Sequence, residues 1–134
     1  MSDLKAIMSR LYDEVFSNGN LGAIDELLDD DFVEHEELPP GIPPGKESPK
    51  ALVSMMRGAF PDFSVAVEEM LQDGNKVVTR ARFSGTHEGE FMGMPPTGNR
   101  FDISVIDIVE FRDDKAIAHW GIMDSAAMME QLGG

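Results

Sequence analysis

Residues 63–84, FSVAVEEMLQDGNKVVTRARFS, decide the fold of this chain, because their side chains alternate between two faces with a period of two. Apolar residues alternate with small or polar ones before Asp73-Gly74, and the alternation resumes after that pair. An aspartate followed by glycine between two alternating runs is a strong signal for a β-hairpin. The stretch therefore predicts two antiparallel strands.

Other elements follow from hydrophobic periodicity on either side of this hairpin. It predicts helices over 3–17, 21–28, 49–60 and 124–132, a brief strand over 31–35, and a second hairpin from 100–112 and 115–123. The proline-rich stretch from Leu38 to Pro49 is predicted to be a loop. Because helices come first and consecutive strands later, the fold class is α+β with a mostly antiparallel sheet.

Composition indicates a single globular domain over residues 1–134. The chain has 11 basic and 25 acidic residues, which give a formal net charge of -14 and make nucleic acid and anionic membranes poor partners. It contains no cysteine, which excludes disulfides, thiolate metal ligands and a cysteine nucleophile. With no apolar run long enough for a membrane span and no signal-peptide pattern, we expect a soluble, cytoplasmic protein.

The segment 85–98, GTHEGEFMGMPPTG, and the ending Gln131-Leu132-Gly133 resemble the signatures of SnoaL-like polyketide and ester cyclases. The opening of the chain, with Asp31-Phe32-Val33 and His35, is similar to the same family. This resemblance implies the nuclear-transport-factor-2-like fold, in which a cone-shaped, curved sheet packs against three N-terminal helices and encloses an apolar cavity. It also implies cofactor-free ring closure with a carboxylate as general acid and base, and a hydrophobic small molecule as ligand.

Two positions depart from that family pattern. Similar cyclases carry the catalytic aspartate in the last strand, at the position of Gly121 in this chain. They carry an active-site histidine in the preceding strand, where this chain has Asp107. The catalytic base is therefore not inherited at its usual position, and any chemistry requires another arrangement.

The turn between the last two predicted strands admits two registers. A two-residue loop pairs Phe111 with Ala116, whereas a three-residue loop pairs Phe111 with Ile117 and Asp107 with Gly121. We favour the three-residue loop, because a slip of one residue would divide the apolar side chains between opposite faces.

That register predicts a catalytic pair made of Asp107 and His119. Both side chains would lie on the apolar face, diagonally across from each other and within reach. A carboxylate among valines is costly unless it is paired, so it either binds a proton or holds a charged imidazole. The pair could perform acid and base catalysis. Alternatively, it could be a structural hydrogen-bond pair, or the carboxylate could reach water at the edge of the sheet.

Further candidates surround this pair. His35 is a third catalytic candidate, since it alternates with Val33 at the predicted first strand, although a structural role is equally compatible. The residues expected to contact the ligand are His87, Phe16, Met55, Phe91, Met94, Val105 and Asp124. His87 could instead stabilise a turn, and Asp124 could instead cap the last helix. The three histidines show no short ligand spacing, so we expect no metal site.

Trp120 is expected on the opposite face of the sheet, together with Ile106, Ile108 and Ile122. A monomer would expose these side chains to water. Together with the family resemblance, this surface predicts a homodimer or a higher homo-oligomer.

Three functions remain open from the sequence. The first is cofactor-independent acid/base catalysis, as in a cyclase or isomerase, on a hydrophobic carbonyl compound. The second is a non-catalytic binding protein for a similar ligand, favoured by Gly121 at the family's catalytic position. A hydrolase in which the pair activates water is the third, with less support.

Overall fold

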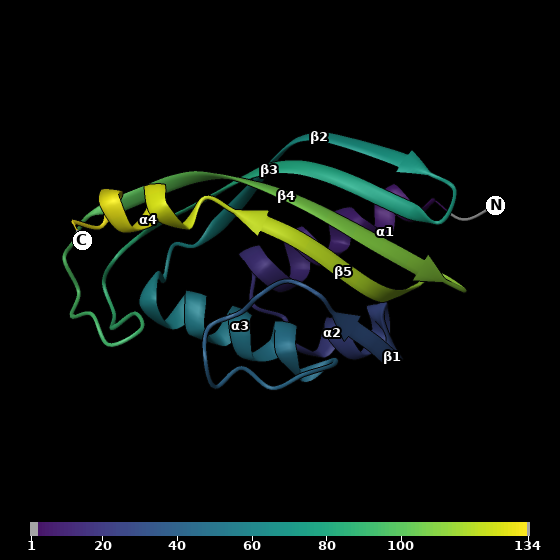
Figure 1. Cartoon of the computed structure of the whole chain (residues 1–134), viewed down its shortest axis with the longest axis horizontal. Coiled ribbons are helices and arrows are strands. Elements are labelled where there is room, and N and C mark those ends of the chain that lie inside the picture. Colours follow the sequence, from purple (N-terminus) through teal and green to yellow (C-terminus); the bar gives the residue numbers. More distant parts are fainter. Residues whose placement is uncertain (1–2, 134) are drawn as a thin grey trace.

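The computed structural model describes residues 3–133. Figure 1 shows a long sheet with helices against it and a short helix at its far end. Along the chain, the elements are α1 (Leu4–Arg10), η1 (Leu11–Ser17), α2 (Gly22–Leu27), β1 (Leu28–Glu34), α3 (Glu47–Ala59), β2 (Ser64–Asp73), β3 (Lys76–Thr86), β4 (Arg100–Arg112), β5 (Lys115–Met123) and α4 (Ser125–Gln131).

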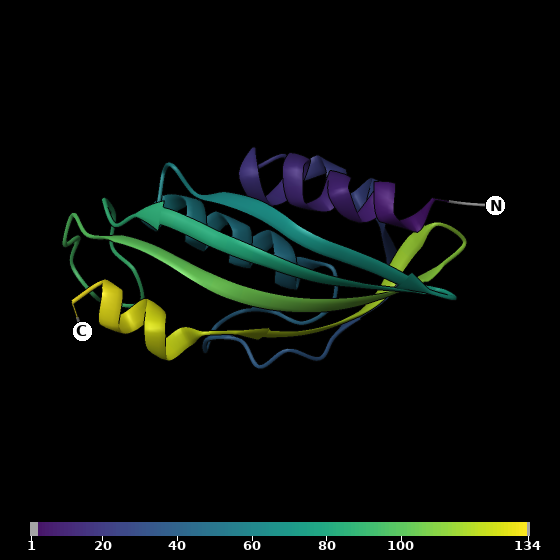
Figure 2. The same cartoon turned by 90° about the horizontal axis from the view of Figure 1, so that it is seen from above.

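The sheet has five strands in the order β1-β5-β4-β3-β2. Its strands pair antiparallel except for β1, which runs parallel to β5. Figure 2 shows that the strands bend along their length and that α1 and η1 run along one side of the sheet. The predicted α+β class, with a curved, mostly antiparallel sheet and three N-terminal helices, is confirmed.

The first helix differs from the uniform helix expected over 3–17. Asp3 caps α1 by accepting a hydrogen bond from the Ala6 N–H. From Leu11 onward the chain is π-helical, and the Asn18 N–H donates to the carbonyl of Asp13, five residues earlier. This wider turn lies where Tyr12 enters the core, with only 2% of its surface exposed. Such π-helical turns are frequent at functional sites.

The first strand begins earlier than expected, at Leu28 instead of Asp31. Leu28 fits the apolar stripe of a helix, but it pairs with Ala116 of β5 and is buried. The interpretation of Leu28 as helical is therefore wrong, because hydrogen bonds to the neighbouring strand outweigh a weak local preference.

The last hairpin contains both registers considered from the sequence. At the turn Phe111 pairs with Ala116, whereas further along Val109 pairs with His119 and Asp107 with Gly121. The prediction that Phe111 faces Ile117 is wrong, and the two pairs further from the turn are confirmed. A β-bulge at Ile117 reconciles them, because one extra residue on β5 shifts the register by one position.

The outer face of the sheet carries exposed apolar residues. Ile106 and Ile122 are 42% and 77% exposed, as expected from their alternation with cavity-facing neighbours. Homodimer formation through this face stays a prediction. Within residues 3–133, no helix is long and apolar enough to cross a membrane.

The turn between β4 and β5 provides a test of this register. Asp113 and Asp114 have φ values of 50° and 66°, the left-handed region in which a Cβ atom is strained. We expect Asp114→Gly to raise the free energy of unfolding by about 1 kcal/mol, measured by urea denaturation. Asp114→Ala is the matched control, since it removes the same charge and keeps the Cβ atom; equal stabilisation by both variants would contradict the assigned turn.

Candidate active site

A cavity of about 670 Å³ lies between the sheet and the helices. Its wall is mostly apolar, with contributions from η1, α3, β4 and the segment after β1. Of the residues predicted to contact a ligand, Phe16, Met55, Phe91 and Val105 line it. Met94 is not among the lining residues; it packs against the core and forms an isolated β-bridge with Phe91. A volume of this size suits a drug-sized organic molecule.

The polar part of the cavity wall is a chain of four hydrogen-bonded side chains. The Tyr12 hydroxyl donates to Asp107 Oδ2 at 2.7 Å, and Asp107 Oδ1 lies 2.8 Å from His119 Nε2. The other ring nitrogen of His119, Nδ1, lies 2.5 Å from Glu34 Oε1. Each imidazole nitrogen therefore faces a carboxylate oxygen, which is the arrangement of an imidazolium that donates two hydrogen bonds.

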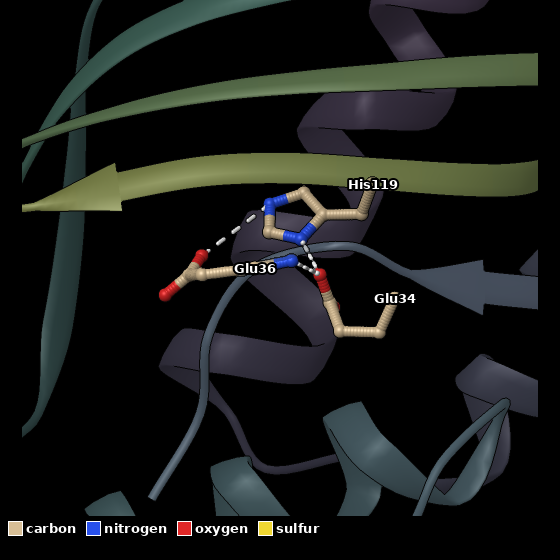
Figure 3. A group of neighbouring side chains, drawn as sticks. All are labelled: Glu34, Glu36 and His119. Carbon is tan, nitrogen blue, oxygen red and sulfur yellow. Dashed lines mark hydrogen bonds and ion pairs between the residues drawn. The ribbon is translucent and has the colours of Figure 1, made fainter.

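Three strands and the helix η1 bring these four residues together from distant parts of the sequence. Beyond the bulge at Ile117, His119 pairs with Glu34 of β1 on one side and with Val109 of β4 on the other. Asp107 is two residues along β4 from Val109 and therefore points to the same face. Figure 3 shows the His119 ring of β5 above Glu34, with Glu36 on the segment that follows β1.

The electrostatics of the chain favour a charged imidazole. Burial alone would lower the pKa of His119, but the hydrogen bonds and negative charges of Asp107 and Glu34 outweigh it and raise that pKa to about 10. Burial, together with the charge of Asp107, raises the pKa of Tyr12 far above its usual value, so the phenol keeps its proton. The cluster thus holds one cation between two carboxylates.

Glu36 is a third carboxylate at this place. Its N–H donates to Glu34 Oε1 at 3.0 Å, and its own Oε1 lies 3.9 Å from His119 Nε2. Burial raises the pKa of Glu36 to about 7, the positive charge of His119 opposes that shift, and the negative charges of Asp107 and Glu34 add to it. This carboxyl group therefore changes its charge near neutral pH.

Gly121 leaves room for this cluster. A Cβ atom at this position would lie 2.2 Å from Glu36 Oε1 and 2.7 Å from Asp107 Oδ1, both shorter than any normal contact. A larger residue would therefore make the ends of both carboxylate side chains shift.

The other two histidines lie elsewhere. His35 is outside the cavity lining, and its ring stacks on Trp120 with centroids 4.6 Å apart. It does not face the cavity as expected, because it follows Glu34 on an extended segment and so points to the opposite face. His87 is fully buried against Phe60 and is also absent from the lining.

His87 and Asp124 both form hydrogen bonds with nearby parts of the chain. The Thr97 N–H donates to His87 Nδ1 at 3.3 Å, which fixes the loop between β3 and β4. Asp124 accepts a hydrogen bond from the Ala127 N–H at 3.1 Å and caps α4. Neither residue lines the main cavity, and these hydrogen bonds are the ones that the structural alternatives predict; the His87 Nε2 atom is buried without a hydrogen-bond partner among the described residues. A ligand-binding role for either residue stays a prediction.

Glu34, Glu36 and His119 place potential metal-ligand atoms within 4.8 Å of one another. Both His119 nitrogens already face carboxylates, however, so an ion could bind this imidazole only by replacing a short hydrogen bond. The arrangement suits proton transfer and charge stabilisation better than metal coordination.

Sequence reasoning missed Tyr12, Glu34 and Glu36. Tyr12 is the only tyrosine of the chain and belongs to the apolar stripe of the first helix, which was a usable signal. Glu34 and Glu36 alternate around His35, so placing His35 outside would have placed both glutamates inside. The error lay in choosing the wrong face for this short strand.

Comparison with known proteins agrees with the fold. The family model described as SnoaL-like polyketide cyclase matches residues 6–132. Nogalonic acid methyl ester cyclase of Streptomyces nogalater is 28% identical over 88% of this chain and 89% of its own. An aklanonic acid methyl ester cyclase of Streptomyces sp. (strain C5) is 31% identical over 85% of this chain and 74% of its own.

Solved structures show the same architecture. TsrD from Streptomyces laurentii superimposes with a TM-score of 0.87 at 26% identity, covering 99% of this chain and 98% of its own. IdmH from Streptomyces antibioticus gives a TM-score of 0.85 at 34% identity, covering 99% of this chain and 100% of its own. The fold places the chain in the nuclear-transport-factor-2-like class. The chain belongs to the SnoaL-like polyketide cyclase family.

The charge of His119 is testable by titration. We expect its imidazole to stay protonated well above pH 6.5 and to lose its proton only near pH 10. Because the folded-state pKa is raised, the stability that this charge contributes is complete below about pH 6.5 and is lost as pH rises through about 10. NMR titration of the ring signals measures the first quantity, and urea unfolding across this pH range measures the second. A ring that titrates near pH 6.5 would contradict the proposed ion pairs.

Proposed function

We propose that this protein is a cofactor-independent acid/base enzyme, of the cyclase or isomerase type, that acts on an uncharged hydrophobic carbonyl compound. The main evidence for this proposal is the hydrogen-bonded chain Tyr12–Asp107–His119–Glu34, which lies in the wall of an otherwise apolar cavity. Membership of the cyclase family and the ester cyclases among its relatives support the same reaction class.

The charge of the cavity wall supports an uncharged substrate. Glu34, Glu36, Glu37 and Asp107 line it, and among the described lining residues His119 is the only basic one. A ligand carboxylate would therefore meet predominantly negative charge in a poorly solvated space, where repulsion is strong. A ketone or an ester avoids that repulsion.

In the proposed reaction, a negatively charged carboxylate acts as the base and the positively charged imidazolium stabilises the anion that forms. A carboxylate takes a proton from a carbon next to a carbonyl group, and the electron pair of the broken C–H bond moves onto the carbonyl oxygen as an enolate. The His119 imidazolium is the positive charge available to stabilise this developing anion. The enolate carbon can then attack a second carbonyl group of the same molecule and close a ring, or it can take up a proton at another position.

Binding without turnover is the second candidate. Two observations favour it: β5 has no side chain at Gly121, and both nitrogens of His119 are already hydrogen-bonded. A protein of this kind would bind the same carbonyl compounds and leave them unchanged.

Deuterium exchange distinguishes these candidates. In deuterium oxide, we expect the protein to exchange the acidic C–H protons of β-tetralone for deuterium faster than buffer alone does. Proton NMR measures this exchange as the loss of the C–H signals. Asp107→Asn should lower the exchange rate by roughly 10²-fold, because it removes a charge that holds the imidazolium in place. Asp102→Asn is the matched control, since Asp102 lies on the same strand and is exposed on the opposite face.

Thermal melting with the same compound gives the second readout. Stabilisation by β-tetralone, by benzoylacetone and by a neutral steroid enone, with no exchange of any of them above the buffer rate, would establish the binding protein and overturn the enzyme. Equal exchange rates for wild type and Asp107→Asn would remove the hydrogen-bonded chain from the mechanism.

A further inference from the structure

We propose that Glu36 is the catalytic carboxylate that takes the proton from the substrate, supplied by the segment after β1 into space that β5 leaves open at Gly121. This inference rests on the proposed acid/base function and names the group that performs its central step. Asp107 and Glu34 then act as positioning residues that keep His119 charged.

The first argument is spatial. The Cβ atom of any side chain at position 121 would lie 2.2 Å from Glu36 Oε1, so the Glu36 carboxylate already occupies the space next to the strand. The same Cβ atom would lie 2.8 Å from His119 Cε1. Glu36 therefore presents its carboxylate beside the imidazolium, at the place where a side chain from β5 would otherwise project.

The second argument concerns hydrogen bonds. Both oxygens of Asp107 are engaged, one with Tyr12 and one with His119. Glu34 Oε1 is engaged with His119 and with the backbone N–H of Glu36. Among the described residues, no hydrogen-bond donor reaches the Glu36 carboxylate within bonding distance, so its lone pairs remain available to a ligand proton.

The third argument concerns solvation and charge. The Glu36 side chain is 16% exposed and lines the cavity. The ionisable groups whose charges act on it are Glu34 from β1, Asp107 from β4 and His119 from β5; Tyr12 and Glu37 line the same cavity. Burial raises its pKa to about 7 against the positive charge of His119, and a base with a pKa near the working pH transfers protons efficiently in both directions.

The proton balance closes without another reactant. Ionised Glu36 accepts the proton from the substrate carbon, and the C–H electrons move into the enolate. After the new carbon–carbon bond forms, the protonated Glu36 returns this proton to the alkoxide oxygen of the product. No oxidant, reductant or metal ion takes part in this sequence.

The test compares Glu36→Gln with wild type in the β-tetralone exchange assay. We expect exchange to fall by roughly 10²–10⁴-fold, with β-tetralone still raising the melting temperature as in wild type. The control is Glu130→Gln, the same change on the exposed surface of α4, and it should leave the rate unchanged. Wild-type exchange should rise with pH through about 7, since the ionised form is the active one, and this step should vanish in Glu36→Gln.

Each outcome separates this inference from the proposed function. Exchange by wild type that survives in Glu36→Gln would overturn the role of Glu36 and leave the enzyme standing. Wild type without exchange would overturn both. Loss of wild-type exchange on adding a chelator, restored by a divalent metal, would assign Glu34, Glu36 and His119 to a metal site and overturn the proton-transfer role.

Moving the carboxylate from position 36 to position 121 tests the spatial argument independently of folding defects at position 36. Glu36→Ala should lose exchange, and Glu36→Ala combined with Gly121→Asp should regain part of it, because the carboxylate returns to the same space from β5. Gly121→Ala alone should slow exchange by displacing Glu36. If it leaves the rate and its pH profile unchanged, the spatial argument is wrong.

Discussion

The interaction on which the site depends is the placement of one imidazolium between two carboxylates. His119 donates to Asp107 and to Glu34, and these bonds compensate the cost of burying its charge. A buried ion pair of this kind is weak evidence for net stability, because desolvation cancels much of the attraction. What it provides is a fixed positive charge in an apolar cavity, where electrostatic stabilisation of a developing anion is most effective.

The β-bulge at Ile117 makes this placement possible. The two-residue turn at Asp113-Asp114 starts the hairpin in one register, and the bulge changes it before His119 is reached. Without the extra residue, the alternation set by the turn would send His119 to the outer face. The π-helical turn of η1 contributes from the other side, since it carries Tyr12, whose hydroxyl holds the second oxygen of Asp107.

The same cluster shows how this chain differs from the pattern of the family it belongs to. Family resemblance implies a catalytic aspartate at position 121, where this chain has glycine. In the structure, the side chains of Glu36 and Asp107 fill the space beside that glycine, and a Cβ atom there would make the ends of both shift. The absence of a side chain on β5 is therefore coupled to the presence of Glu36 on the neighbouring segment, and the two features are best understood as one arrangement.

The sequence alone determined the fold class, the hairpins and the pairing of Asp107 with His119, because periodicity and turn signals report local geometry and the alternation of a strand. It even set Asp107 opposite Gly121, although through the wrong pair at Phe111. Only the tertiary structure decided that His35 points away from the cavity, that Tyr12 reaches Asp107, and that Glu34 and Glu36 complete the cluster. The local alternation groups Glu34 with Glu36 on one face and His35 on the other. Which face is inside depends on how β1 pairs with β5 and how η1 packs on the sheet, which are contacts between segments separated by many residues.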